Sequence, residues 1–316
     1  MADVLCFGNL QFDVLCRSVT TLPPPGELRM IDSIDFALSG NAGNVAAALG
    51  RLGINVELAG YSGADVVGEQ FRTMLSAMGV GTAKLLRHPT VSTGTSVITL
   101  SPGGERSIIF VNGANELFDL DTVPDAWLEQ TRVVYVGSIF VLPQFTGEAV
   151  GRLFTRARAH GAMTVLNICW DARGQGIPFL KPALAEVDYF ILSYDEGRQL
   201  TGHTLPESIV DSLKVHTRGN VILTLGADGC CVDDKAGLQQ IPALSVEATD
   251  CTGAGDAFAA GFSAGLVEGL SVYDCARLGC HVASFAVTGP SAYPRIPPLT
   301  EVKQIGKPFG QMSAKR

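Results

Sequence analysis

The stretch from Asp250 to Phe262, which reads DCTGAGDAFAAGF, holds the residues whose types and spacing could do chemistry. Gly253, Ala254 and Gly255 carry almost no side chain, so another group can approach their backbone closely. A helix that starts here would direct free N–H groups and a positive dipole end at an anion such as a phosphate. Asp256 could then accept a proton from a hydroxyl beside that anion. The pattern suits phosphoryl transfer to an alcohol, although glycine turns before helices are more often only structural.

The helix expected after this turn should bury one face. Phe258, Phe262 and Leu266 recur every four residues, which is the spacing of a buried helical stripe. Gly261 and Gly265 lie about one turn apart and would allow close packing on a neighbouring helix. The glycine turn would therefore be fixed at the start of a core helix.

Length and composition indicate a cytoplasmic α/β protein. A chain of 316 residues can bury a large core, and its 47% hydrophobic residues suit a buried parallel sheet. The net charge of −8, without any basic block, argues against nucleic-acid binding. No apolar run approaches the roughly 18 residues that span a membrane, and the N-terminus lacks the basic start of a secretory signal. The eight cysteines include no C-x-x-C pair, so we expect reduced thiols rather than a zinc site.

Apolar strand patterns alternate with helical patterns along most of the chain. The expected strands cover 3–8, 15–19, 55–63, 132–139, 163–170, the first part of 189–202 and a strand pair in 221–234. The expected helices cover 38–53, 68–80, 146–161, the second part of 189–202, the stretch after Gly255 and 271–289. This order predicts a doubly wound, mostly parallel sheet flanked by helices.

One region interrupts this alternation. The runs 95–100 and 105–111 are rich in β-forming residues, and the glycine turn between them predicts a hairpin. A hairpin inside a βα series suggests a small β-sheet lid over the edge of the main sheet. Because we find no internal repeat and no low-complexity linker, we expect a single domain over 1–316, with lid segments at approximately 10–37 and 92–113.

A second glycine-rich stretch, SGNAGN at 39–44, precedes the helix that Gly53 is expected to end. Gly40, Asn41 and Asn44 could simply cap that helix, since Asn and Gly are good capping residues. The same amides and side chains could instead hold a polyol. The residues alone leave both interpretations open.

The two glycine-rich stretches resemble the two signatures of the ribokinase-like (PfkB) carbohydrate kinase family, in the right order and about two hundred residues apart. The later one is similar to D-[TS]-x-G-A-G-D, with Cys251 in place of Thr or Ser. The earlier one departs from its signature only at Ser39, where the family has Ala or Gly. The resemblance covers nearly the whole chain. It implies a ribokinase-like fold and transfer of the ATP γ-phosphate to a hydroxyl of a sugar or sugar-like polyol.

The resemblance also implies roles for single residues. Asp256 matches the catalytic base, and Gly253, Ala254 and Gly255 match the anion hole. The positions that match substrate-binding residues are Asp13, Gln11, Gly40, Asn41 and Asn44. Taken alone, Asp13 would be interpreted as a solvated charge at a strand end.

On the nucleotide side, Thr224 and Gly226 match a strand end that touches ATP. Glu196 matches the glutamate of an N-x-x-E motif that lies near the phosphates and near Mg²⁺, which it reaches through water. Ser193 replaces the asparagine of that motif, and serine lacks the amide pair. Taken alone, Glu196 could equally be an exposed helix charge.

A monovalent cation, K⁺, is bound by some members of the family. Asp250 and the segment 287–291 match the place where they bind it. An ordinary loop at a helix exit explains the same segment equally well.

Two alternatives to a sugar kinase stay open. The chain could be a nucleoside kinase of the same family, or a nonenzymatic sugar- or nucleotide-sensing protein on the same fold. A nucleoside would need a slot for its base, and Phe12, Phe36 and Phe110 are the aromatic candidates near the lid. The dense set of hydroxyl-binding groups favours a free sugar or sugar acid.

The lid could move freely or form half of a dimer interface, so both a monomer and a homodimer are compatible with the sequence.

Overall fold

A large central sheet organises the protein. The computed structural model describes residues 2–103, 105–234, 237–289, 293–306 and 309. The strands of the central sheet are β1 (Val4–Phe7), β4 (Val56–Gly63), β5 (Val80–Gly81), β6 (Leu85–His88), β9 (Val133–Gly137), β10 (Met163–Asn167), β11 (Tyr189–Ser193), β12 (Asn220–Thr224), β13 (Cys230–Asp234) and β14 (Gly237–Ile241).

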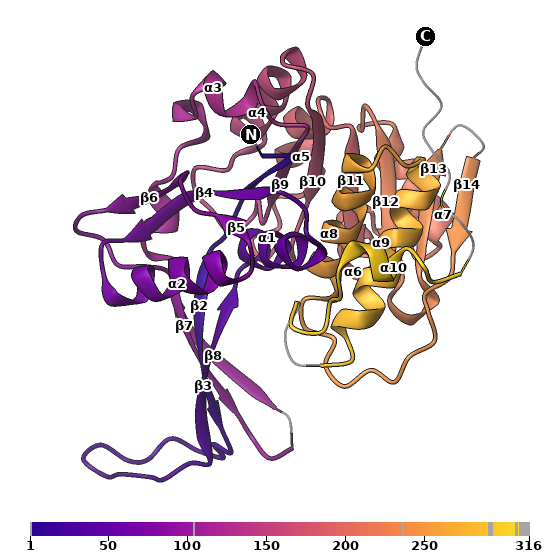
Figure 1. The fold of residues 1–316 in the computed structure, drawn as a ribbon. Coiled ribbons are helices and arrows are strands. Elements are labelled where there is room, and N and C mark those ends of the chain that lie inside the picture. Colours follow the sequence, from indigo (N-terminus) through magenta and orange to yellow (C-terminus); the bar gives the residue numbers. More distant parts are fainter. Residues whose placement is uncertain (1, 104, 235–236, 290–292, 307–308, 310–316) are drawn as a thin grey trace.

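The strand order of this sheet is β14-β13-β12-β11-β10-β9-β1-β4-β5, and β6 pairs with β4 (Figure 1). All neighbours from β12 to β5 are parallel, whereas β12, β13 and β14 pair antiparallel. The predicted doubly wound, mostly parallel sheet is therefore confirmed.

Helices cover both faces of the sheet. They are α1 (Asn41–Leu52), α2 (Val66–Ala77), α3 (Asp125–Leu128), α4 (Gly147–Ala159), α5 (Gly176–Leu184), α6 (Tyr194–Thr201), α7 (Pro206–Lys214), α8 (Ala254–Val267), α9 (Val272–Ala286) and α10 (Leu299–Val302). The short 3₁₀ turns are η1 (Gly113–Leu117), η2 (Leu120–Thr122) and η3 (Gly226–Asp228). Within the described ranges, no helix combines the length and the apolar character that crossing a bilayer requires.

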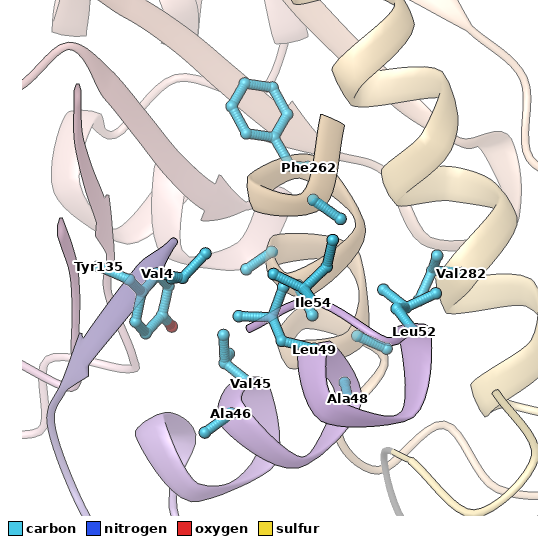
Figure 2. Packing of buried hydrophobic residues seen from close by; sticks show 14 of the residues in the cluster. Val4, Val45, Ala46, Ala48, Leu49, Leu52, Ile54, Tyr135, Phe262 and Val282 are labelled. Carbon is cyan, nitrogen blue, oxygen red and sulfur yellow. The ribbon is translucent and has the colours of Figure 1, made fainter. Parts of the chain in front are cut away.

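Alternation along the strands divides the core into two halves. Val4 and Cys6 face a cluster formed with α1, α2, α8 and α9, whereas Leu5 and Phe7 face a cluster formed with α4, α5 and α7. Figure 2 shows part of the first cluster, in which the ring of Tyr135 lies beside Val4. Burial on both faces explains why the central strands read as continuous apolar runs.

Helix α8 is buried more completely than the sequence suggested. Phe258, Phe262 and Leu266 are buried as predicted, and so is every other residue from Ala257 to Val267. The reason is that α8 packs between the sheet, α1 and α9. A Cβ at Gly261 would lie 2.9 Å from the Cα of Gly279, and one at Gly265 would lie 2.9 Å from the Cα of Cys275. The predicted close packing at these two glycines is confirmed.

A separate four-stranded sheet projects from the body of the molecule (Figure 1). It comprises β2 (Gln11–Arg17), β3 (Ser33–Ser39), β7 (Thr95–Leu100) and β8 (Arg106–Val111), in the order β3-β2-β7-β8. The predicted hairpin is confirmed as the antiparallel pair β7 and β8. The strand expected at 15–19 begins earlier, at Gln11, because its first half pairs with the end of β3 and the start of β7. That this sheet acts as a lid stays a prediction.

Candidate active site

The carboxyl ends of the parallel strands bring polar residues together along one edge of the central sheet. β1 leads to Asn9 and Gln11, while β10, β11 and β12 end at Asn167, Ser193 and Thr224. The strand order reverses at β1, which has β4 on one side and β9 on the other. Open α/β sheets bind their ligands outside the carboxyl ends at such a reversal.

Helix α8 begins directly after the glycine turn, as predicted. Its N-cap is Gly253, with a φ of 77° in the left-handed region that glycine adopts without strain. A Cβ on Gly255 would meet no atom within 4 Å, so there is open space beside the first turn. The first amides of a helix lack partners within it. Together with this space they suit an anionic group.

Asp256 lies in the first turn of α8, and two asparagine side chains hold its carboxylate. The Nδ2 of Asn41 donates to Oδ1 over 2.5 Å, and the Nδ2 of Asn44 donates to Oδ2 over 2.7 Å. Burial raises the pKa of Asp256 to about 6, although these two hydrogen bonds lower it, and the charge of Glu196 adds a further increase. A carboxylate that titrates near neutral pH suits a general base.

Gly40 is the N-cap of α1, and it has a structural reason to be glycine. Its φ is 79°, and a Cβ there would collide with the carbonyl oxygen of Asn9. No side chain caps this helix, so Asn41 and Asn44 are free to reach Asp256. The structure thus brings the two glycine-rich stretches together at one carboxylate.

Asp13 lies in the middle of β2 and is buried, with 9% of its surface exposed. The interpretation as a solvated strand-end charge is therefore wrong. Burial raises the pKa of Asp13, and hydrogen bonds from the hydroxyls of Ser39 and Ser96 lower it. Gln11, also buried, donates from Nε2 to the carbonyl oxygen of Val111 over 3.0 Å and ties β2 to the end of β8.

The register of the small sheet separates the three aromatic candidates. Directly paired residues lie on the same face of a sheet. Asp13 pairs with Ser96, and Ser96 pairs with Phe110, so Phe110 shares the face of Asp13. Phe12 and Phe36 lie on the opposite face, where their ring centroids are 5.7 Å apart.

Arg106, at the start of β8, joins the small sheet to the glycine turn. Its Nη1 donates to the Oγ1 of Thr252 over 3.0 Å, and Thr252 immediately precedes Gly253. This contact was not predicted from the sequence. The one sequence signal for it was the positive charge of Arg106 next to the turn of the predicted hairpin.

A cavity of about 380 Å³ lies beside the start of α8. Four residues that the sequence predicted for the site line this cavity: Thr224, Gly226, Ala254 and Gly255. Its apolar wall includes Leu244, Val246, Phe258, Ala283 and Val287. Ligand pockets of roughly 300–1,000 Å³ are typically apolar with a few polar groups, and this cavity has that character. The loop over 243–248 and the face of α9 that form the wall were not predicted.

The motif on α6 forms a capping box. The hydroxyl of Ser193 accepts from the backbone N–H of Glu196 over 3.3 Å, and the carboxylate of Glu196 accepts from the backbone N–H of Ser193 over 2.7 Å. Glu196 is half-buried, so its interpretation as an exposed helix charge is wrong. Burial raises the pKa of Glu196, and the bonds from Ser193 lower it.

Comparison with known proteins decides the family. The pfkB family carbohydrate kinase profile matches residues 1–298. The chain belongs to this family. A ribokinase from Lactococcus lactis is 28% identical over 306 residues, which cover 96% of each chain. A nucleoside kinase from Methanothermobacter thermautotrophicus is 27% identical over 312 residues, which cover 98% of this chain and 97% of the relative.

Solved structures confirm the ribokinase-like fold of this PfkB-family kinase. The structure of Arabidopsis thaliana ribokinase complexed with ribose and ATP has a TM-score of 0.83 at 23% identity, covering 96% of this chain and 98% of that chain. Adenosine kinase from Sinorhizobium meliloti has a TM-score of 0.81 at 25% identity, covering 96% and 99%.

ATP binding follows from membership of this kinase family. We call the cavity beside α8 the nucleotide cavity, and that ATP binds there stays a prediction. Its apolar wall suits a base, and the open space at Gly255 next to the α8 N-terminus suits phosphates. Within the described residues, no group of three or more His, Cys, Asp or Glu side chains could hold a metal ion. Relatives of this kind generally use Mg²⁺ with ATP, and binding of the ion mainly through phosphate oxygens and water stays a prediction.

Asp250 lies against the exit of α9. Its backbone N–H donates to the carbonyl oxygen of Val287 over 3.2 Å, and its carboxylate accepts from the backbone N–H of Thr252 over 2.8 Å. Residues 290 and 291 of the expected cation-binding segment lie outside the described residues. Binding of K⁺ at this place stays a prediction.

Proposed function

We propose that this PfkB-family kinase transfers the γ-phosphate of ATP to a hydroxyl of a free sugar or sugar acid. The observation that carries the proposal is the placement of Asp256. Its carboxylate lies in the first turn of α8, next to Gly255 of the nucleotide cavity, and is fixed by two amides of α1. A carboxylate with a raised pKa beside a helix start, which could bind an anion, supports the proposal.

In the proposed reaction, Asp256 accepts the proton of the acceptor hydroxyl. The hydroxyl oxygen forms a bond to the γ-phosphorus while the bond from that phosphorus to the β–γ bridging oxygen breaks, and ADP leaves with the electron pair. The backbone amides of Gly253 and Gly255 stabilise the charge on the transferring group, joined by the amide of Ala254 once it releases the carbonyl oxygen of Cys251, to which it donates over 3.2 Å. Glu196 would hold Mg²⁺ through water, and the bound ion would neutralise charge on the triphosphate.

The choice of a sugar as acceptor rests on the face of the small sheet that carries Asp13. A buried carboxylate can accept hydrogen bonds from two vicinal hydroxyls at once. Phe12 and Phe36 lie on the other face, which leaves Phe110 as the aromatic side chain on the face of Asp13. One aromatic ring offers less than the enclosed slot that a nucleoside base needs, so the sugar is favoured over the nucleoside.

The direct test is competition among acceptors on the wild-type enzyme with ATP and Mg²⁺. The panel contains free pentoses, hexoses and sugar acids together with adenosine, inosine and cytidine, and the measurement is kcat/KM for each. We expect the highest value for a free sugar or sugar acid. A much higher value for a nucleoside would replace the sugar assignment by a nucleoside kinase. Phosphorylation of none of them would favour the nonenzymatic sensor.

A further inference from the structure

A chain of buried polar side chains lies behind Asp256, and the proposed mechanism does not use it. Tyr135 of β9 is completely buried in the core cluster (Figure 2). Its hydroxyl donates to the Oδ1 of Asn41 over 2.6 Å. The Nδ2 of Asn41 lies 2.5 Å from the Oδ1 of Asp256 and 3.0 Å from the Oδ1 of Asn167. The hydroxyl of Tyr135 is also 3.1 Å from that Asn167 oxygen.

The direction of this chain is set at its far end. The Nδ2 of Asn167 donates to the backbone carbonyl oxygen of Ile191 over 3.1 Å, and a carbonyl can only accept. Asn167 must therefore present its Oδ1 to Asn41. Asn41 in turn must present its Nδ2 to Asn167 and Asp256. Its Oδ1 then faces Tyr135, whose single hydroxyl proton goes to this nearer acceptor.

Two further observations show that the amide of Asn41 is fully used within this chain of polar side chains. Both N–H groups of its amide have partners within the protein, Asp256 and Asn167, so none is left for a substrate hydroxyl. Gly137, at the end of β9, leaves the room that the amide occupies, because a Cβ there would overlap the Oδ1 of Asn41. Glycine at this position is thus required for the chain.

We propose that Tyr135 is a positioning residue for Asp256, which it orients through Asn41. The hydroxyl holds the amide of Asn41 so that an N–H faces the carboxylate, and Asn167 fixes the direction. Asn41 then orients the base, instead of binding the acceptor as the family resemblance implied. The inference rests on the proposed role of Asp256 as the base.

The electrostatic surroundings suit this role. Burial and the charge of Asp256 hold the pKa of Tyr135 far above its ordinary value. The hydroxyl therefore stays protonated, and can donate, over the whole pH range in which the enzyme is active. The other titratable groups that act on this centre are Glu196 of α6, whose charge raises the pKa of Asp256, Cys6 of β1 and Cys169, next to β10. Burial holds the pKa of the Cys6 thiol far above its ordinary value, so this thiol is neutral. Burial raises the pKa of Cys169 to about 11, so its thiol is neutral as well.

The test is Tyr135→Phe, which keeps the packed ring and removes only the hydroxyl. We expect kcat to fall about tenfold, which corresponds to the loss of one hydrogen bond of about 1.4 kcal/mol. KM for ATP should stay within about twofold. The acidic limb of the kcat–pH profile should move to higher pH, because the ionised form of Asp256 loses support. In the ligand-free protein, the upper end of the pH range over which acidification stabilises the fold should move in the same direction, while the lower end, set by the unfolded chain, stays in place.

The matched control is Tyr189→Phe. Tyr189 of β11 is buried on the same side of the sheet and packs against Phe262 of α8, with ring centroids 5.3 Å apart. Among the described residues, the hydrogen bonds that link Asp256, Asn41, Asn167 and Tyr135 do not include the hydroxyl of Tyr189. Loss of this hydroxyl should leave kcat and the acidic limb unchanged.

Wild-type kcat and an unmoved acidic limb in folded Tyr135→Phe would overturn the inference, as would equal shifts in both tyrosine variants. If Tyr135→Phe does not fold, Asn167→Ala removes the group that sets the direction of Asn41. The same two shifts are then expected, and their absence would overturn the inference. Failure of the base assignment is recognised separately. Asp256→Asn would then keep its turnover, whatever Tyr135→Phe does.

Discussion

The Nδ2 of Asn44 and the Oδ2 of Asp256 are joined by a hydrogen bond of 2.7 Å, although the two residues are 212 positions apart in the chain. The bond links the first turns of α1 and α8, and the bond from Asn41 fixes the other carboxylate oxygen. Two glycine-rich stretches that look independent in the sequence thus build one site. Because both carboxylate oxygens are held, Asp256 has a defined orientation before any acceptor binds.

Replacing Asp256 by Asn should abolish most of the turnover and spare ATP binding. Loss of a general base typically costs about 10²–10⁴-fold in rate. Asn keeps the size of the side chain, and Asp256 does not line the nucleotide cavity. Steady-state kinetics give the rate, and calorimetric titration gives the affinity for ATP. The exposed Asp211→Asn on α7 is the matched control and should behave as the wild type. Near-normal turnover in a folded Asp256→Asn protein would refute the role of the carboxylate as base.

The pKa of Asp256 makes a second prediction, about stability and pH. The pKa is about 6 in the folded protein, compared with its ordinary 3.8. Between about pH 4 and 6 the folded state therefore binds more protons than the unfolded state. Raising the pH through this window should lower the free energy of unfolding of the wild type relative to Asp256→Asn. Above the window the difference should be constant.

Urea unfolding of both ligand-free proteins at several pH values between 4 and 8 measures this difference. Glu196 and Asp13 also have raised pKa values, so the stability of the wild type alone would mix three groups. Subtracting the variant isolates the part that depends on Asp256. A difference that does not vary with pH would mean that the carboxylate titrates at its ordinary value.

Ser193→Asn should be tolerated. Ser193 is the N-cap of α6, and Asn is about as good an N-cap as Ser. The free energy of unfolding should therefore change by less than about 1 kcal/mol, and ATP affinity should be equal or higher because the variant restores the residue usual in the family. Ser193→Ala is the informative comparison, since it should lose about 1 kcal/mol with the cap. A collapse of ATP binding in folded Ser193→Asn would show that α6 was matched to the wrong motif.

The parts of the site that the sequence predicted are those with local signals. The turn before Asp256 and the loop around Gly40 are recognisable because glycine and small residues there follow from backbone geometry and close approach. The parallel strands are recognisable because both faces are buried and the runs are apolar throughout. These signals need no knowledge of distant contacts.

The missed parts depend on contacts between distant segments. Tyr135 stands in the apolar run VVYVG and looks like an ordinary core residue, because nothing local shows that its hydroxyl meets Asn41. The wall of the nucleotide cavity at 243–248 has no regular structure and hence no periodicity. Strand β3 carried a readable signal in the alternation of Ile34, Phe36 and Leu38, which the analysis overlooked beside the glycine loop that follows. The short helices α5 and α7 were missed as well.

The last prediction concerns the acceptor and Asp13→Ala. If Asp13 binds two acceptor hydroxyls in its buried position on β2, its loss should weaken acceptor binding by about 2–4 kcal/mol. ATP affinity should change little, because the small sheet contributes no residue to the wall of the nucleotide cavity. The hydroxyls of Ser39 and Ser96, which now bond the carboxylate, can turn to each other or to water, so the sheet should stay folded.

Asp35→Ala is the matched control. Asp35 lies on the same sheet but is exposed and paired with Arg17, so its loss should leave the acceptor KM unchanged. Calorimetric titration of the best acceptor from the panel, with ATP titrated separately, measures both affinities. If folded Asp13→Ala binds the acceptor as tightly as the wild type does, the acceptor lies away from β2, and the small sheet does not provide its binding site.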